Sequence, residues 1–495
     1  MQDIAVIRKL IDANVQASGC EFQQFTVRAL EGFDYYGNQD KIKQCGAAAI
    51  DEVNAYLKIK GANPLHSADN RISMNRHKIV VDQKIGYLFS KPPQFDLPED
   101  DAAAGDKALL KQVNDTVGTD WPKVIKQLGI DASNTGRAWM AYWSGDDGFH
   151  FWYVNPLTVT PIYDRSTVRK RLQYLIRSYS YIDATGNPCT RYEVWDENEV
   201  AYLIRPQAGT APQIDFEVLP GGAWNIQKHD YGRIPFIEFD NDAHADGDLH
   251  MYRDIIDAFD KLFSGFANDI DDLQEIIWCI TNYRGATSET TFDKDGNEIN
   301  KTVDLLQELK AKKWVSVDDK GGLEAIHGEI PYEARGKMYE LLDAEFWKAA
   351  MAVNPAPDTA GNQSGVYIDH LYGLLELKAG LMETEFRSAI NEFLAAILHY
   401  LKADESKQFV QTWKRTKPQN DVEVSQIIAQ TPSTVVSDET KTKKHPLVDD
   451  WEAERARIKK EQEQKQQDML DQYPPGHEQE PGGPQQPNAN DGGAA

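Results

Sequence analysis

The chain has 495 residues, more than one ordinary hydrophobic core accommodates, so two or more domains are expected. Hydrophobic residues make up 41% and aromatic residues 10%, which is enough for a sizeable buried core. The formal net charge of −25 excludes a protein that grips DNA over its whole surface, because phosphate binding needs clustered lysine and arginine. The simplest meaning of this acidity is a soluble surface that repels other copies.

The cysteines are widely separated and form no Cys-x-x-Cys pair; they are Cys20, Cys45, Cys189 and Cys279. This spacing is typical of reduced thiols in a cytosolic protein and not of a disulfide framework or a zinc site. The N-terminal residues lack the apolar region of a signal peptide, and no stretch approaches the roughly 18 apolar residues that span a membrane. The sequence therefore predicts a protein made and used in the cytoplasm, without membrane contact.

Helical spacing of apolar residues predicts helices over the first third of the chain. The predicted helical stretches are 1–60, 70–90 and 105–130. The second of these is stopped by Pro92 and Pro93, which cannot continue a helix.

From about 135 to 240, short aromatic and β-branched runs alternate with turn signals. The clearest turns are Gly145–Gly148, Ala184–Asn187 and Pro220–Gly222. This texture predicts an antiparallel meander, and hence an α+β fold that is mainly α.

From Leu249 to Ile280, apolar residues follow one another at steps of three and four. The core of this seam is Ile256, Phe259, Phe263, Phe266, Ile270 and Leu273. The repeat predicts one unbroken helix of roughly 48 Å, with acidic residues on its other faces. Such a seam packs either in a coiled coil within the chain or against copies of itself in an oligomer.

A smaller segment at 284–330 separates this helix from a second one at about 331–352. The segment is predicted to hold a hairpin turn at Asp293–Asn297, a helix near 302–312 and a strand at Trp314–Val317. A third long helix is expected over Val366–Leu401.

The loop between the second and third helices is small, polar and without an apolar anchor. The candidate functional residues of this loop are Asn354, Pro355, Asp358, Thr359, Gly361, Asn362, Gln363 and Ser364. The composition predicts a loop that faces water, either in a water-filled space or as a connector on the outer surface.

The C-terminal region predicts a strand at 408–415 and helices at 421–430 and 449–470. The tail from Tyr473 is rich in proline, glycine and glutamine and is expected to be disordered.

Sites for chemistry are sparse in this sequence. It contains no phosphate-binding Gly-x-x-x-x-Gly-Lys-Ser/Thr loop and no hydrolase or zinc-protease motif. Residues 293–304 imitate a calcium loop, but the glycine stands at position four and Asp304 replaces the final glutamate. The alternating set His244, Asp246, Asp248 and His250 fits the acidic start of a helix better than a metal site. No cofactor, metal or catalytic residue is predicted.

Several segments, taken in order, resemble the portal proteins of long-tailed phages of Gram-positive bacteria. They are 70–93, 231–239, 252–264, 364–366 with 375–378, and 413–450. Of these, 252–264 (YRDIIDAFDKLFS) is the most specific. The matches extend to about residue 458, and the sequence departs from the family in 284–330 and in the tail.

The resemblance implies a ring of a dozen or so copies, a homododecamer, in which each chain has wing, stem, clip and crown regions. Carried over, the regions are a wing at 1–247, a stem helix at 248–281, a clip at 282–330, a second stem helix at 331–352, a tunnel loop at 353–364, a channel helix at 365–384, a crown with C-terminal helices at 385–470, and a tail at 471–495.

The resemblance also implies a function without catalysis, as a channel at one capsid vertex for packaging and ejecting DNA. The implied partners are the terminase large subunit at the clip, major capsid and scaffold proteins at the wing, a head–tail adaptor, and duplex DNA held without sequence preference. The implied location is the virion, after assembly in the host cytoplasm. Two other classes stay open: another ring-forming head-completion or adaptor protein, and an enzyme with a site in the β-rich region.

Overall fold

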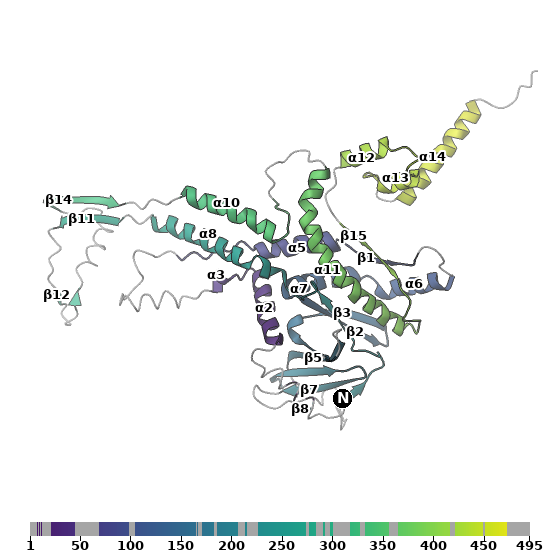
Figure 1. Cartoon of the computed structure of the whole chain (residues 1–495), viewed down its shortest axis with the longest axis horizontal. Coiled ribbons are helices and arrows are strands. Elements are labelled where there is room, and N and C mark those ends of the chain that lie inside the picture. The colour runs from purple at the N-terminus through teal and green to yellow at the C-terminus, as the bar shows by residue number, and fades with distance from the viewer. Residues whose placement is uncertain are drawn as a thin grey trace, which may run out of the picture. The chain divides into compact units, whose positions relative to one another are not determined.

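The computed structural model (Figure 1) describes residues 7, 9, 11, 21–44, 69–98, 104–164, 166, 171–182, 186–205, 213–214, 226–273, 277–283, 291–292, 298–299, 317–326, 332–355, 365–415, 421–448 and 451–472. The chain divides into two compact units. Unit 1 comprises Met1–Pro357 and Tyr372–Lys417, and unit 2 comprises Asp358–Leu371 and Pro418–Ala495. Helices and strands are both plentiful, so the predicted mixture of helix and sheet is confirmed.

The N-terminal helices of unit 1 follow the predicted pattern. They are α2 (Glu21–Tyr36), α3 (Lys41–Gln44), α5 (Arg76–Phe89), α6 (Ala104–Val117) and α7 (Trp121–Thr135). As expected, α5 ends before the tandem prolines, which lie in strand β1 (Lys91–Asp96). Helix α7 ends at Gly136, whose left-handed φ of 92° lets its N–H bond to the carbonyl of Ala132. The last part of the helical stretch predicted over 1–60, residues 45–60, lies outside the described residues.

The antiparallel meander is confirmed. Its strands are β2 (Arg137–Gly145), β3 (Gly148–Val154), β4 (Val159–Asp164), β5 (Arg171–Ile182), β6 (Pro188–Trp195), β7 (Glu199–Arg205), β8 (Gln213–Ile214), β9 (Ile226–Lys228) and β10 (Phe236–Asp240). One sheet has the order β10-β2-β3, and the other has the order β4-β5-β6-β7-β8 with β9 beside β7. The predicted turn at Gly145–Gly148 closes the β2–β3 hairpin.

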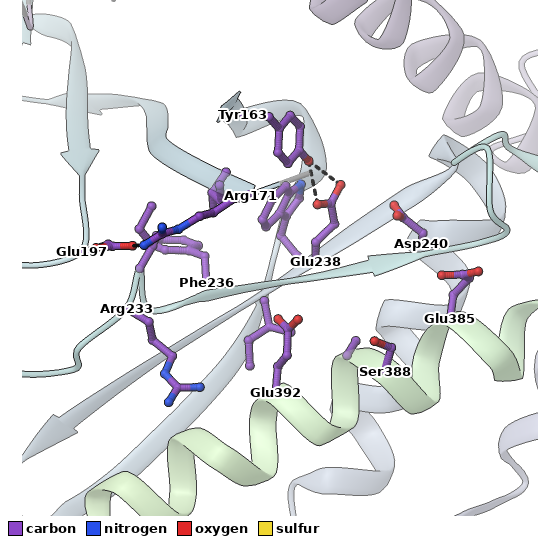
Figure 2. Close-up of a pocket in the computed structure, with 15 residues that line it drawn as sticks. Tyr163, Arg171, Glu197, Arg233, Phe236, Glu238, Asp240, Glu385, Ser388 and Glu392 are labelled. Carbon is purple, nitrogen blue, oxygen red and sulfur yellow. Dashed lines mark hydrogen bonds and ion pairs between the residues drawn. The ribbon is translucent and has the colours of Figure 1, made fainter. Parts of the chain in front are cut away.

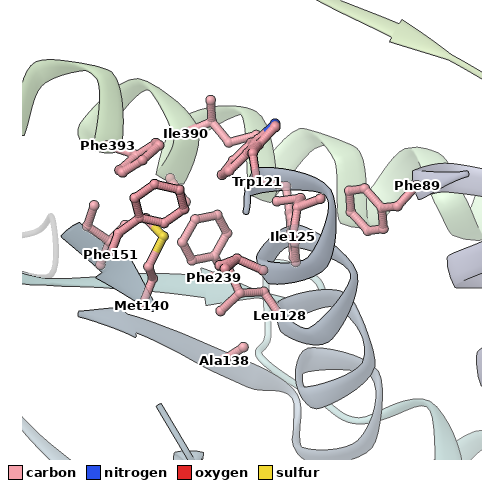
Figure 3. Close-up of a cluster of buried hydrophobic side chains, with 14 of the residues drawn as sticks. Phe89, Trp121, Ile125, Leu128, Ala138, Met140, Phe151, Phe239, Ile390 and Phe393 are labelled. Carbon is pink, nitrogen blue, oxygen red and sulfur yellow. The ribbon is translucent and has the colours of Figure 1, made fainter. Parts of the chain in front are cut away.

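The main core of unit 1 joins residues that are far apart in the sequence (Figure 3). Helix α11 (Gly365–Tyr400) supplies Phe393, whose ring stacks on that of Trp121 with centroids 5.4 Å apart. It also supplies Phe386, which meets Phe239 of β10 at 5.0 Å. Strand β15 (Val410–Lys414) then pairs with β1. The third predicted helix and the C-terminal strand are therefore present, and both belong to this core.

The prediction of one helix from 248 to 281 is wrong. The chain forms a short 3-10 turn, η2 (Asp248–Met251), then α8 (Arg253–Leu273), and then strand β11 (Ile277–Tyr283). Helix α8 is 21 residues long, or about 32 Å, and not the roughly 48 Å predicted. Its apolar spacing continues into β11, but β-branched and aromatic residues there favour a strand, and β14 (Val317–Ile326) pairs with it.

The segment between the long helices contains paired strands. Besides β11 and β14, β12 (Thr291–Phe292) pairs antiparallel with β13 (Glu298–Ile299). Strand β14 runs from Val317 to Ile326 through its pairing with β11; of the strand predicted at 314–317, only Val317 belongs to the described residues. The predicted turn at 293–297 and helix at 302–312 lie outside the described residues.

Helix α10 (Tyr332–Ala349) matches the second predicted helix and lies beside α8 in Figure 1. Unit 2 contains α12 (Asp421–Gln430) and α14 (Trp451–Gln472), both predicted, and α13 (Asp438–Lys444), which was not. The Ser437 hydroxyl caps α13, and Arg455 of α14 pairs with Glu439 at 2.7 Å. The tail from Tyr473 lies outside the described residues.

Candidate subunit interface and channel elements

The predicted seam on α8 is shared between a buried end and an exposed end. Ile256 and Phe259 are fully buried, and the Phe259 ring meets Tyr339 of α10 edge-on at 5.0 Å. Phe263 and Phe266 are half-buried, while Ile270 is 44% exposed. Leu273 is the last residue of the helix. The first turns of the seam therefore pack within the chain, which was one of the two alternatives; the other was packing against copies in an oligomer.

A buried arginine holds this helix pair together. The Arg76 guanidinium of α5 lies 3.8 Å from the centroid of the Phe259 ring and 5.1 Å from that of Phe346. It donates to Asp343 of α10 at 2.8 Å, so its charge is both paired and stacked. Nothing in the local sequence distinguishes Arg76 from a surface arginine, because its partners come from two distant helices.

One side of the α8–α10 pair carries an apolar groove of about 340 Å³. It is lined by Ala258, Lys261, Leu262, Gly265, Arg335, Met338 and Leu342. Met338 is 47% exposed, and the neighbouring Leu341 is 54% exposed. Large apolar side chains gathered on one face of a helix pair favour contact with another protein surface.

A buried ionic cluster fixes the start of the helix pair. Asp248 accepts from Lys84 at 2.9 Å and forms an ion pair with Lys378 at 3.2 Å. Lys84 also donates to Asn241, and Lys378 donates to the carbonyl of Ala350 at the end of α10. The two lysines and the aspartate are 1%, 5% and 3% exposed. The cluster therefore ties η2, α5, α10 and α11 to one another.

Burial and charge act against each other in this cluster. Burial alone would raise the pKa of Asp248, but Lys378 and Lys84 hold it well below its ordinary value. Burial lowers the pKa of Lys84 to about 8, against the opposing effect of Asp248. Burial also lowers the pKa of His77 to about 4, and its ring lies between the Tyr252 hydroxyl and Asn134, each at 2.8 Å.

The alternating His/Asp set is thus divided among other partners. Asp248 is occupied by lysines, Asp246 pairs with Arg28 at 2.7 Å, and His250 contacts the carbonyl of Gly247. Among the described residues, no three His, Cys, Asp or Glu side chains are grouped so as to hold a metal ion. The interpretation of this set as the start of a helix agrees with the 3-10 turn at Asp248–Met251.

A carboxyl pair lies at the contact of α3 with α8. Asp40 and Asp260 face each other and are each only 1% exposed. Burial raises the pKa of Asp40. Burial, together with the facing Asp40 carboxyl, raises the pKa of Asp260 to about 8. At neutral pH the pair therefore carries fewer than two negative charges.

Only the start of the polar loop belongs to the described residues. Asn354 donates to Asp343 at 3.3 Å, and the Gln83 side chain bonds both the N–H and the carbonyl of Val353. Pro355 is exposed. The other singled-out residues, Asp358, Thr359, Gly361, Asn362, Gln363 and Ser364, lie outside the described residues.

The family model described as "Phage portal protein, SPP1 Gp6-like" matches residues 21–468. The chain belongs to this portal family. The portal protein of Clostridium phage phiCD119 is 32% identical over 443 residues, covering 86% of this chain and 90% of the relative. That of Bacillus phage SPP1 is 27% identical over 478 residues, covering 93% and 87%.

A chain from a solved structure described as "Neck of native GTA particle computed with C12 symmetry" is also similar. Its TM-score is 0.38 at 12% identity, covering 78% of this portal chain and 90% of its own length. The resemblance found in the sequence is confirmed by the family match: this is a portal protein of tailed phages. Within the described parts of the chain, no helix is long and apolar enough to cross a membrane.

Proposed function

We propose that this portal protein assembles into a closed ring whose centre passes duplex DNA during packaging and ejection. The observation that supports it best is the apolar groove on the α8–α10 pair, with Met338 and Leu341 exposed beside it. A second copy is the occupant we propose, since a closed cyclic assembly covers the same apolar surface on every subunit. The ring size we propose is the homododecamer that membership of the portal family implies.

Charge on the helix pair suits a channel that lets DNA slide. Asp254 and Asp271 of α8 are exposed, and the chain as a whole carries a net charge of −25. Repeated around a ring, acidic side chains repel phosphates, so DNA would pass without adhering to the wall. Contacts with DNA would then be weak and independent of sequence.

The proposed regions follow the family. α8 and α10 form the stem, the segment at 282–330 is a clip that docks the terminase large subunit, and the wing at 1–247 meets major capsid and scaffold proteins. The loop at 353–364 would project into the channel, beginning at the Val353–Gln83 bonds that anchor its first residue. The scheme also has a crown that begins at residue 385 and a head–tail adaptor as a partner of the ring. The ring itself would lie at one capsid vertex of the virion.

The proposed role needs no catalysis by this chain. Its sequence has no phosphate-binding loop, so the energy for packaging would come from the terminase. Purified protein that hydrolyses ATP at a constant specific activity through further purification steps would refute this part of the proposal.

The ring is tested by the double substitution Met338→Asp with Leu341→Asp. Both side chains are about half exposed, so the subunit should fold normally, but two carboxylates in the interface should prevent association. Size-exclusion chromatography with light scattering should give rings for the wild type and monomers for the variant. The matched control is Ile427→Asp in α12, which is 58% exposed and outside the helix pair. Intact rings from the double variant would contradict the proposed interface.

A further inference from the structure

A second cavity lies away from the helix pair, between α11 and the two sheets (Figure 2). Its volume is about 500 Å³, within the range of about 300–1,000 Å³ that ligand pockets occupy. Tyr163 and Arg171 approach from β4 and β5, and Glu385, Ser388 and Glu392 approach from α11 on the opposite side. Every lining residue belongs to unit 1.

The lining is strongly acidic. It contains Glu197, Glu238, Asp240, Glu385 and Glu392 against Arg171 and Arg233. Some of these charges are already matched: Arg137 pairs with Glu238 at 3.1 Å and with Asp240 at 3.8 Å, and Arg171 pairs with Glu197. Tyr163 also donates to Glu238 at 2.6 Å. Arg233 is held by Glu405, which lies outside the lining. Glu385 has neither a hydrogen bond nor an ion pair to any described residue, so its charge is available to a cation.

The pocket also follows the outer edge of β10. This strand pairs with β2 on one side and ends the sheet on the other. Lining residues come from both of its faces: Phe236 and Glu238 alternate with Ile237. A cavity that reaches both faces of an edge strand lies along that edge.

The backbone of β10 can be oriented from its bonds to β2. The N–H of Asn241 bonds to the carbonyl of Gly136, and the carbonyl of Pro235 accepts from Tyr142. In an antiparallel pair, bonded residues alternate with residues whose backbone groups point the other way. The N–H and carbonyl of Glu238 therefore point away from β2, toward the pocket side.

We propose that this pocket binds an extended, lysine- or arginine-bearing peptide segment of a partner protein, which adds as a strand to the outer edge of β10. The backbone of such a segment pairs with the outward-facing N–H and carbonyl of Glu238. Its basic side chains meet Glu385 and Glu392. A small cation would satisfy the carboxylates but not the strand edge. The proposal does not depend on ring formation.

The test uses a short fluorescein-labelled peptide that alternates valine with lysine, followed by fluorescence anisotropy at physiological salt. Saturable binding to wild-type protein is expected, and Glu385→Lys should weaken it at least about tenfold, because a rim carboxylate becomes a repelling charge. The matched control is Glu461→Lys in α14, which makes the same charge change at an exposed site and should bind like the wild type. Equal affinity for wild type and Glu385→Lys would mean that Glu385 does not contact the peptide, and equal weakening by Glu385→Lys and Glu461→Lys would mean that the peptide responds only to net charge; either result would overturn the proposal.

Strand addition is tested separately with the same peptide N-methylated at alternate residues, which keeps its charge but removes backbone donors. Its binding should be lost. A photo-crosslinking group in the unmethylated peptide should label segments that contain β10 or α11. Undiminished binding of the N-methylated peptide, labelling confined to other segments, or no saturable binding would each refute the site.

Discussion

The substitution Asp248→Asn should be among the most damaging single changes in unit 1. It keeps the shape of the side chain but removes the carboxylate that pairs with both Lys84 and Lys378, which stay buried at 1% and 5% exposure. Removing one partner of a buried ion pair costs about 3–5 kcal/mol, because the other charge is left uncompensated. We expect a loss of stability of that order.

The matched change Lys378→Met should be milder, although it affects the same cluster. Asp248 would keep Lys84 at 2.9 Å, so the remaining charges would balance one to one. The main loss is the bond from Lys378 to the carbonyl of Ala350, worth about 1–3 kcal/mol if that carbonyl stays dry. The two variants therefore differ in the amount of uncompensated buried charge, two positive charges for Asp248→Asn and none for Lys378→Met, and not only in the number of lost bonds.

Urea unfolding followed by tryptophan fluorescence measures this difference, since Trp451 alone of the 11 tryptophans belongs to unit 2. The change in free energy is the shift in midpoint multiplied by the slope of the transition, provided that the slope is unchanged. Lys378→Met proving as destabilising as Asp248→Asn would refute the charge accounting. The cluster would then act through packing.

Three further outcomes are expected. The folded-state pKa of Asp260 is about 8, above its ordinary value, so wild-type stability should fall as pH rises from about 4 to about 8. Asp260→Asn, still facing Asp40, Asp257 and Lys43, cannot titrate, so its unfolding midpoint should gain on that of the wild type over the same pH range. Gly32→Ala should lower the free energy of unfolding by about 1–3 kcal/mol in thermal unfolding, because the added Cβ would lie 2.0 Å from the carbonyl oxygen of Asn134. Gly86→Ala in α5 should raise the free energy of unfolding by up to about 1 kcal/mol, because its Cβ meets nothing within 4 Å. Phe259→Ala should cost about 3–5 kcal/mol while Ile270→Ala, at 44% exposure, stays near the wild type; equal losses would contradict the division of the seam.

The sequence was most informative where structure depends on neighbouring residues. The spacing of apolar residues located α10 and α11, and aromatic runs broken by glycine turns located the meander, because both periodicities are local properties. The same spacing failed at Ile277, where it continued unchanged although pairing with β14 converts the chain to a strand. The spacing of residues within one segment carries no information about a partner strand that lies much further along the chain.

The candidate site was only partly predictable for the same reason. The sequence placed Phe259 on the correct seam. Its burial within the chain, however, depends on contacts with Arg76 and Tyr339, which come from other elements. The Lys84–Asp248–Lys378 cluster carried no local signal, since Lys84 and Asp248 are 164 residues apart. Long-range charge pairing emerges only when the fold brings its members together.

The pairing of β1 with β15 has a consequence for how the chain is synthesised. Strand Lys91–Asp96 finds its partner only when Val410–Lys414 has left the ribosome, and Trp121 likewise waits for Phe393. Contacts of such long separation slow folding and leave apolar surface open meanwhile. Most of the polypeptide must therefore be translated before the core of unit 1 can close.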